Sequence, residues 1–160
     1  MSRHDGHVRM TSPGRRRALQ AASALALGAC LPARAAEGSL PAIPVMAAYL
    51  AGRIPRRERV RLELPRLADN GLAVPMRIVV NGPFAPGLFV RAIRLFSEIN
   101  PVPDMAVFEY PQPPARVEIE SRIRLAGTQQ VVAIAEMTDG TLFAAVTEVV
   151  VTLAGCMDGT

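Results

Sequence analysis

The sequence predicts an all-β fold, an antiparallel immunoglobulin-like β-sandwich, from three observations. Apolar and polar residues alternate with a period of two through most of the chain after residue 59, as in strands with one buried face. Turn-forming residues interrupt these runs about every 8–12 residues, a spacing typical of sandwiches. The composition, with 14 prolines and only 4% aromatic residues, suits short strands joined by many turns. A chain of 160 residues is long enough for one such core.

The first two predicted strands read "VRLEL" and "LAVPMRIVV", with the turn "ADNG" between them. Pro75 has no backbone N–H to donate, so we expect the second strand to start at a sheet edge or to carry a bulge. The next run, "FVRAIRLFSEI", fits a helix or a strand by periodicity alone, and its β-branched and aromatic residues favour a strand. "MAVFEY" follows as a short strand closed by "PQPP".

The clearest alternation lies at residues 117–125. Apolar residues and one serine share one face: Val117, Ile119, Ser121, Ile123 and Leu125. Charged residues share the other: Glu118, Glu120, Arg122 and Arg124. We expect this charged face to be solvated and to form ion pairs across strands. An alternative role for its two arginines is to steer anionic substrates.

The last two predicted strands are "QVVAIAEM" and "LFAAVTEVVVTL". They flank Asp139-Gly140, a dipeptide that predicts a tight hairpin turn with positive φ at both residues.

Residues 1–35 have the three-part form of an export signal. Three consecutive arginines precede an apolar stretch from Ala18 to Leu31, and the A-x-A sequence at residues 33–35 follows. The paired arginines predict a twin-arginine-type signal peptide, and the apolar stretch is too short for a permanent membrane span. A disordered basic tail would explain neither feature. Cys30 either belongs to the apolar core and is discarded, or is lipidated within the box "LGAC".

The rest of the chain divides into three parts. Residues 36–58 form a lead-in segment, in which "PVMAAYLAG" predicts a short helix closed by Gly52. Residues 59–153 form the sandwich, and residues 154–160 form a flexible C-terminal arm.

The basic charge is concentrated in the predicted signal. All 18 basic residues are arginines. Six of them and one of the 14 acids lie in the first 35 residues, which leaves 12 arginines against 13 acids. A mature chain with a net charge of −1 offers no broad basic surface, so we expect no nucleic-acid partner.

The mature chain also lacks the residues of many active sites. Its two histidines, His4 and His7, leave with the signal, and it has no lysine. These absences exclude Ser-His and Cys-His pairs, histidine-ligated metals and lysine Schiff bases. We therefore expect no metal and no cofactor.

The one cysteine of the mature chain, Cys156, follows the last predicted strand. An unpaired cysteine in an exported protein indicates an intermolecular disulfide or a reactive thiol. A few extended residues at roughly 3.3–3.6 Å each would carry this thiol about 10 Å clear of the sandwich. Gly155 and Gly159 are expected to give the arm its flexibility.

Several stretches of the sequence resemble a known family. They are "ADNGLAVPMRI", "INPVPDMAVFEY" and "SRIRLAGTQQVVAIAEMTDGTLF" leading into "EVVVTLAGC". The resemblance is to SoxY, the thiol-bearing subunit of the SoxYZ sulfur carrier of thiosulfate oxidation. It implies a periplasmic carrier that is not itself an enzyme and that binds thiosulfate-derived intermediates on Cys156. It also implies a heterodimer with a SoxZ-type subunit, and visits to a c-type cytochrome, a hydrolase and a dehydrogenase of the Sox system.

This chain departs from the Gly-Gly-Cys-Gly-Gly ending of that family. Ala154 replaces the first glycine, and Met157 and Asp158 replace the two that follow the cysteine. These changes keep two alternatives open. One is a diverged structural or binding module whose thiol no longer carries sulfur, and the other is a homodimer linked through Cys156.

Overall fold

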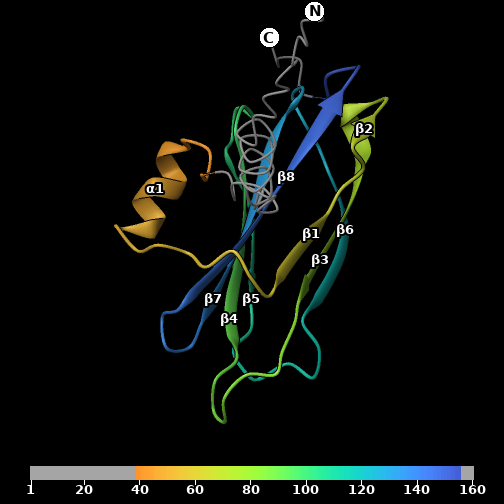
Figure 1. Ribbon diagram of the computed structural model, residues 1–160. Coiled ribbons are helices and arrows are strands. Elements are labelled where there is room, and N and C mark those ends of the chain that lie inside the picture. Colours follow the sequence, from red (N-terminus) through yellow and green to blue (C-terminus); the bar gives the residue numbers. More distant parts are fainter. Residues whose placement is uncertain (1–38, 156–160) are drawn as a thin grey trace, which may run out of the picture. The chain divides into compact units, whose positions relative to one another are not determined.

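The computed structural model describes residues 39–155, which form one compact unit (Figure 1). The predicted signal peptide with Cys30 lies outside the described residues, and so do Cys156 and Gly159.

Two β-sheets build this unit, which confirms the predicted all-β sandwich (Figure 1). The three-stranded sheet has the order β1-β3-β6, with β1 at Val60–Glu63, β3 at Val74–Val80 and β6 at Glu118–Ile123. The five-stranded sheet has the order β2-β8-β7-β4-β5, and its strands are β2 (Leu67–Ala68), β8 (Leu142–Val151), β7 (Gln129–Met137), β4 (Val90–Ser97) and β5 (Asp104–Glu109). The run that fitted a helix or a strand is therefore a strand, β4, as its composition favoured.

The described strands pair antiparallel with one exception. The two residues of β2 run parallel to the end of β8, with Leu67 opposite Val150 and Ala68 opposite Val151. In Figure 1, β2 lies beside the arrowhead of β8. This short pairing matters for function because it ties the end of the last strand to the segment around residue 70.

The main core lies between the two sheets. Its fully buried side chains come from strands of both sheets and from the segment after β6; they include Ile78, Ile93, Leu95, Leu125, Val131 and Val149. Each such aliphatic side chain contributes about 1.5–3 kcal/mol when it is removed from water. This core fixes the positions of the loops at both ends of the sandwich.

A second apolar cluster lies under the helix α1 (Pro44–Leu50), on the other face of the five-stranded sheet (Figure 1). Ile43 and Met46, 1% and 2% exposed, pack with Phe96 and with outward-facing residues of β7 and β8. The helix predicted in the lead-in segment is confirmed. Its chain reversal uses left-handed backbone at both Ala51 (φ 47°) and Gly52 (φ 81°).

A buried carboxylate also anchors α1. The Glu136 carboxylate of β7 accepts hydrogen bonds from the Tyr49 hydroxyl (2.6 Å) and from the guanidinium of Arg53 (3.0 Å), and it pairs with Arg91 (2.7 Å). Burial alone would raise the pKa of Glu136, but the hydrogen bonds from Tyr49, Arg53 and Arg91 outweigh burial and leave this pKa below its ordinary value. The helix is therefore held to the sheet by both apolar packing and charge.

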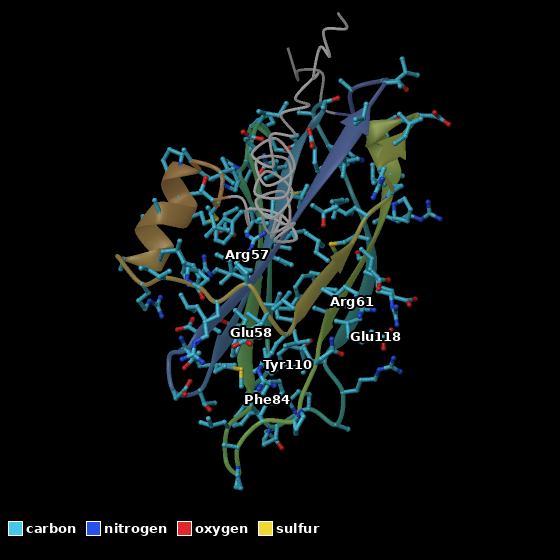
Figure 2. The ribbon with its side chains drawn as sticks, in the orientation of Figure 1. Arg57, Glu58, Arg61, Phe84, Tyr110 and Glu118 are labelled. Atoms are coloured by element: carbon cyan, nitrogen blue, oxygen red, sulfur yellow. The ribbon has the colours of Figure 1, made fainter. Side chains whose placement is uncertain are left out.

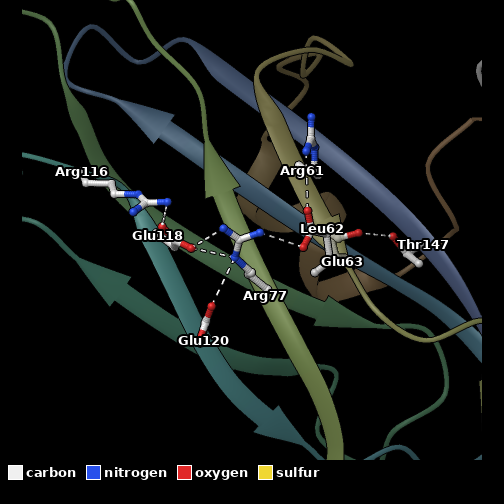
Figure 3. A network of polar contacts seen from close by, with 8 residues as sticks. All are labelled: Arg61, Leu62, Glu63, Arg77, Arg116, Glu118, Glu120 and Thr147. Atoms are coloured by element: carbon white, nitrogen blue, oxygen red, sulfur yellow. Dashed lines mark hydrogen bonds and ion pairs between the residues drawn. The ribbon is translucent and has the colours of Figure 1, made fainter.

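The charged face predicted for residues 117–125 lies on the outside of the three-stranded sheet (Figure 3). The Arg77 guanidinium of β3 lies between the carboxylates of Glu63 on β1 (3.1 Å) and of Glu118 and Glu120 on β6 (3.3 Å to Glu120). This arrangement confirms the predicted cross-strand ion pairs. Figure 2 places Arg61 and Glu118 on this sheet, and Arg57 and Glu58 on the segment between α1 and β1.

The prediction for Pro75 is confirmed at the start of its strand. β3 is the central strand of its sheet, but β1 reaches only as far as Arg77, so β3 has an open edge on that side at Pro75. The prediction for the hairpin turn needs correction. The turn between β7 and β8 has positive φ only at Gly140 (83°) and not at Asp139. The Gly140 N–H donates to the Met137 carbonyl, and the Met137 N–H donates to the Thr141 carbonyl. This pattern is a type I turn with a glycine bulge, a three-residue loop, rather than the predicted two-residue turn.

Candidate functional site at the root of the C-terminal segment

The chain does not leave the sandwich when β8 ends. After Val151 it runs through Thr152 and Leu153 to Gly155, which is buried. The Gly155 N–H donates to the Leu125 carbonyl (2.8 Å), and the Leu125 N–H donates to the Gly71 carbonyl (2.8 Å). The Gly71 N–H in turn donates to the Leu153 carbonyl (2.8 Å). Three backbone segments, around residues 71, 125 and 154, are thus tied together, and we call this place the root.

Glycine is required at two positions of the root. A Cβ added to Gly155 would lie closer than 3.0 Å to backbone atoms of Gly71 and Leu72. A Cβ added to Gly71 would lie equally close to the Leu125 carbonyl oxygen and at 2.7 Å from the Gly155 nitrogen. The two backbones therefore touch because neither residue has a side chain.

Further hydrogen bonds lead up to this contact. The Thr152 N–H donates to the Ala68 carbonyl (3.1 Å), and the Thr152 hydroxyl donates to the Asp69 carbonyl (2.8 Å). On the other side, the Val151 N–H donates to the Thr128 hydroxyl (3.0 Å). Residues 151–155 are therefore held along their length by the loops after β2 and before β7.

The side-chain amides of Asn100 and Gln129 hold the loop on which the root rests. The Asn100 amide donates to the Arg124 carbonyl (2.9 Å), and its oxygen accepts from the Ala126 N–H and from the Gln129 amide (2.9 Å each). Gln129 is only 3% exposed, and its amide also donates to the Gly127 carbonyl (3.2 Å). These bonds bracket Leu125, which accepts the Gly155 N–H, so the two amides fix the loop that holds the root.

Exposed apolar side chains are concentrated at the sandwich end that holds the root. Six of the nine large apolar side chains that are exposed in residues 39–155 belong to this end: Leu67, Leu72, Ile99, Val102, Val150 and Leu153. Leu72 is 52% exposed and follows Gly71 in the chain. Leu153 is 66% exposed, and its carbonyl accepts the Gly71 N–H. A partner that approaches the root therefore meets apolar surface.

A hollow of about 300 Å³ opens beside the root. Its lining comes from β3, β4, β5, β6 and the segments that follow β4 and β6, and includes Met76, Val102, Met105 and Phe108. Arg122 and Arg124 also line it, and both are exposed. The arrangement combines an apolar interior with two cations at one site.

The structure places the predicted site residues unevenly. Cys156 and Gly159 lie outside the described residues, and Gly155 lies in the root rather than in a flexible arm. Gly71, far away in sequence, packs against Gly155, and the flexibility expected at Gly155 stays a prediction to be measured. The expected reach of the Cys156 thiol therefore stays a prediction, because Cys156 lies outside the described residues.

Sequence reasoning missed Gly71, Asn100 and Gln129 as parts of the site. The turn "ADNG" was interpreted only as a connection, and a polar residue in a loop gives no signal of a partner far along the chain. One signal was present. Asn70-Gly71, Asn100, Leu125 to Gln129 and Gly155 all lie within the sequence stretches that carry the SoxY resemblance, and the structure brings those stretches together at the root.

Within residues 39–155 there is no group of three or more His, Cys, Asp or Glu side chains placed to hold a metal ion. The same residues contain no helix long and apolar enough to cross a lipid bilayer.

Comparison with known proteins assigns the family. The family model described as sulfur oxidation protein SoxY matches residues 46–156, most of the chain. The chain belongs to the SoxY family. The resemblance predicted from sequence is confirmed, and the family places this SoxY-type chain in sulfur oxidation, among the proteins of a Sox system.

Solved structures agree with this assignment. The sulfur carrier protein SoxY from Chlorobium limicola f thiosulfatophilum is 29% identical over 68% of this chain and 94% of its own, with a TM-score of 0.55. A superoxide reductase (neelaredoxin) from Ignicoccus hospitalis is 18% identical over 59% of this chain and 80% of its own, with a TM-score of 0.50, and shares the fold alone. No curated protein sequence matches the chain.

Proposed function

We propose that this SoxY-type protein is a periplasmic covalent sulfur carrier with Cys156 as the attachment point. The observation that carries the proposal is that the SoxY match extends to residue 156, so it includes the cysteine itself. The structure supports it by fixing the preceding residue at an apolar end of the sandwich.

The chemistry proposed for Cys156 begins with oxidative coupling. The thiolate sulfur forms an S–S bond with the outer sulfur of thiosulfate, and two electrons pass to a c-type cytochrome. A hydrolase then adds water across the S–SO₃ bond, which releases sulfate and leaves a persulfide on the cysteine. A dehydrogenase then oxidises the outer sulfur of the persulfide to an S-sulfonate, with three water molecules as the oxygen source and six electrons passing to the electron acceptor of that enzyme. The hydrolase adds water across the new S–SO₃ bond, which releases a second sulfate and regenerates the thiol. In this scheme the chain supplies the thiol and its presentation, and the enzymes supply catalysis.

Charge beside the root suits an anionic cargo. The thiosulfonate adduct is negative, and Arg122 and Arg124 line the hollow that opens next to the root. Exposed guanidinium groups attract such an anion, although salt screens the effect. We therefore propose that these two arginines attract the negatively charged adduct on Cys156. This role is the alternative to a charged face that is only solvated.

The proposed organisation follows the sequence with one change. Residues 1–35 act as a twin-arginine signal peptide, residues 36–58 as the lead-in and residues 59–153 as the sandwich. The carrier arm begins after Gly155 rather than at residue 154, because Gly155 is part of the root. A SoxZ-type subunit completes the heterodimer.

Reconstitution tests this function. The mature chain, its SoxZ-type partner, the c-type cytochrome and thiosulfate are combined, and intact mass is measured. We expect a thiosulfate-derived adduct on the chain that is absent from the Cys156→Ser variant. An unmodified thiol under these conditions would favour the second candidate, a diverged binding module, for which Met157 and Asp158 in place of glycine are the supporting observation. A persistent Cys156 disulfide between two copies would favour the homodimer.

A further inference from the structure

We infer that Gly71 and Gly155 form a backbone lock that fixes the point at which the cysteine leaves the sandwich. In this arrangement residues 154 and 155 are held to the sandwich and provide no hinge. The inference rests on the proposed function for its meaning, but it concerns the described residues and is tested on them directly.

The hydrogen bonds of the root form a closed set around the lock. Gly155 donates to Leu125, Leu125 donates to Gly71, and Gly71 donates to Leu153, each at 2.8 Å. Leu125 is fully buried in the main core, so this set is connected directly to the core. Movement of Gly155 away from the sandwich breaks its hydrogen bond to Leu125. The Leu125 carbonyl oxygen then has no hydrogen-bond partner among the described residues.

The absence of side chains makes the lock specific. Alanine at either Gly71 or Gly155 would place its Cβ among backbone atoms closer than 3.0 Å, and backbone cannot rotate aside as a flexible side chain can. Gly127, in the loop that supports the root, offers a matched control. A Cβ there would meet only the Ile99 Cδ1 at 3.4 Å, an ordinary contact.

The lock has a consequence for delivery. Because Gly155 is held at the end of the sandwich, the chain continues to Cys156 from a fixed point there. An enzyme that receives the thiol must therefore bring its active-site entrance to the end of the sandwich, where Leu72 and Leu153 are exposed. The lock makes Gly71 and Gly155 positioning residues for the reacting sulfur.

Amide hydrogen exchange measured by NMR tests the lock on the mature chain with its SoxZ-type partner. In the wild-type protein we expect the Gly155 amide to be protected on the order of tenfold or more relative to an unstructured amide. Gly71→Ala should abolish this protection while the amides of Val131 and Ile134 in β7 stay protected. Gly127→Ala should leave the Gly155 amide as in the wild type.

A spectroscopic signature on the thiol itself gives a second measurement. A nitroxide attached to Cys156 should show restricted motion in the wild-type protein and in Gly127→Ala, and fast motion in Gly71→Ala and Gly155→Ala. If either glycine variant fails to fold, the wild-type measurements alone decide.

An unprotected Gly155 amide together with a freely rotating label in the wild-type protein would overturn the lock. Sulfur loading of Cys156 under that result would leave the carrier function intact, whereas a protected amide without loading would retain the lock and reject the carrier.

Discussion

Replacement of Asn100 by alanine is the sharpest test of how the root is supported. The change removes the hydrogen bond to the Arg124 carbonyl and the acceptor for the Ala126 N–H and the Gln129 amide. A hydrogen bond contributes about 0.5–1.5 kcal/mol net, and a buried group left without a partner costs about 1–3 kcal/mol. The Gln129 amide keeps its bond to Gly127, so it is not fully orphaned. We therefore expect Asn100→Ala to lower the free energy of unfolding by about 2–4 kcal/mol.

Urea unfolding of the mature chain followed by circular dichroism measures this loss. Asn81→Ala is the matched control, because the Asn81 side chain is exposed and makes no hydrogen bond with the described residues. Asn100→Asp keeps the acceptor oxygen and loses the donor to Arg124, so it should fall between the wild type and Asn100→Ala. If Asn100→Ala and Asn81→Ala unfold within about 0.5 kcal/mol of each other, the amides do not support the root.

Three further predictions concern α1, the hairpin and the apolar end. Because the pKa of Glu136 is lowered by its partners in the folded protein, its stabilising effect is present above its ordinary pKa of 4.5 and is lost as pH falls through the lower folded value. Thermal unfolding should therefore show a steeper loss of stability below pH 4.5 in the wild type than in Glu136→Gln, and equal slopes would contradict the anchor. Gly140→Ala should destabilise the chain by about 1 kcal/mol in urea because φ at this position is 83°, and a stability equal to wild type would reject the bulge geometry. Leu153→Ser should change the free energy of unfolding by less than about 0.5 kcal/mol, since the side chain is 66% exposed. The same variant should slow the loading of Cys156 in the reconstituted system. Unchanged loading would show that the enzymes do not contact this end of the sandwich.

Local sequence patterns were sufficient for the elements and not for the root. The alternation at residues 117–125 predicted which side chains of β6 share a face and that its charged face forms ion pairs across strands, because strand periodicity decides which side chains share a face. Ser121, on the apolar face, is exposed. For residues 89–99 periodicity did not decide between helix and strand, and the β-branched and aromatic composition correctly favoured a strand because such side chains pack well on a pleated sheet. The family followed from longer stretches of sequence rather than from any single motif.

The misses arose where two distant segments meet. Gly155 beside the cysteine predicts a flexible backbone, since glycine is permissive in an unpacked chain. The same absence of a side chain allows close backbone approach when Gly71 is opposite, and no pattern within residues 154–160 reveals that contact. The turn type predicted for Asp139-Gly140 was wrong for a related reason. The register between β7 and β8 decides which turn closes the hairpin.

The central claim is that Cys156, at the locked end of the sandwich, carries sulfur in the cell. Intact mass of the protein purified from cells that are oxidising thiosulfate tests it most directly. We expect a chain without residues 1–35 that carries sulfur-derived mass on Cys156, with no such mass in Cys156→Ser. A chain from those cells that bears only an unmodified thiol would contradict it.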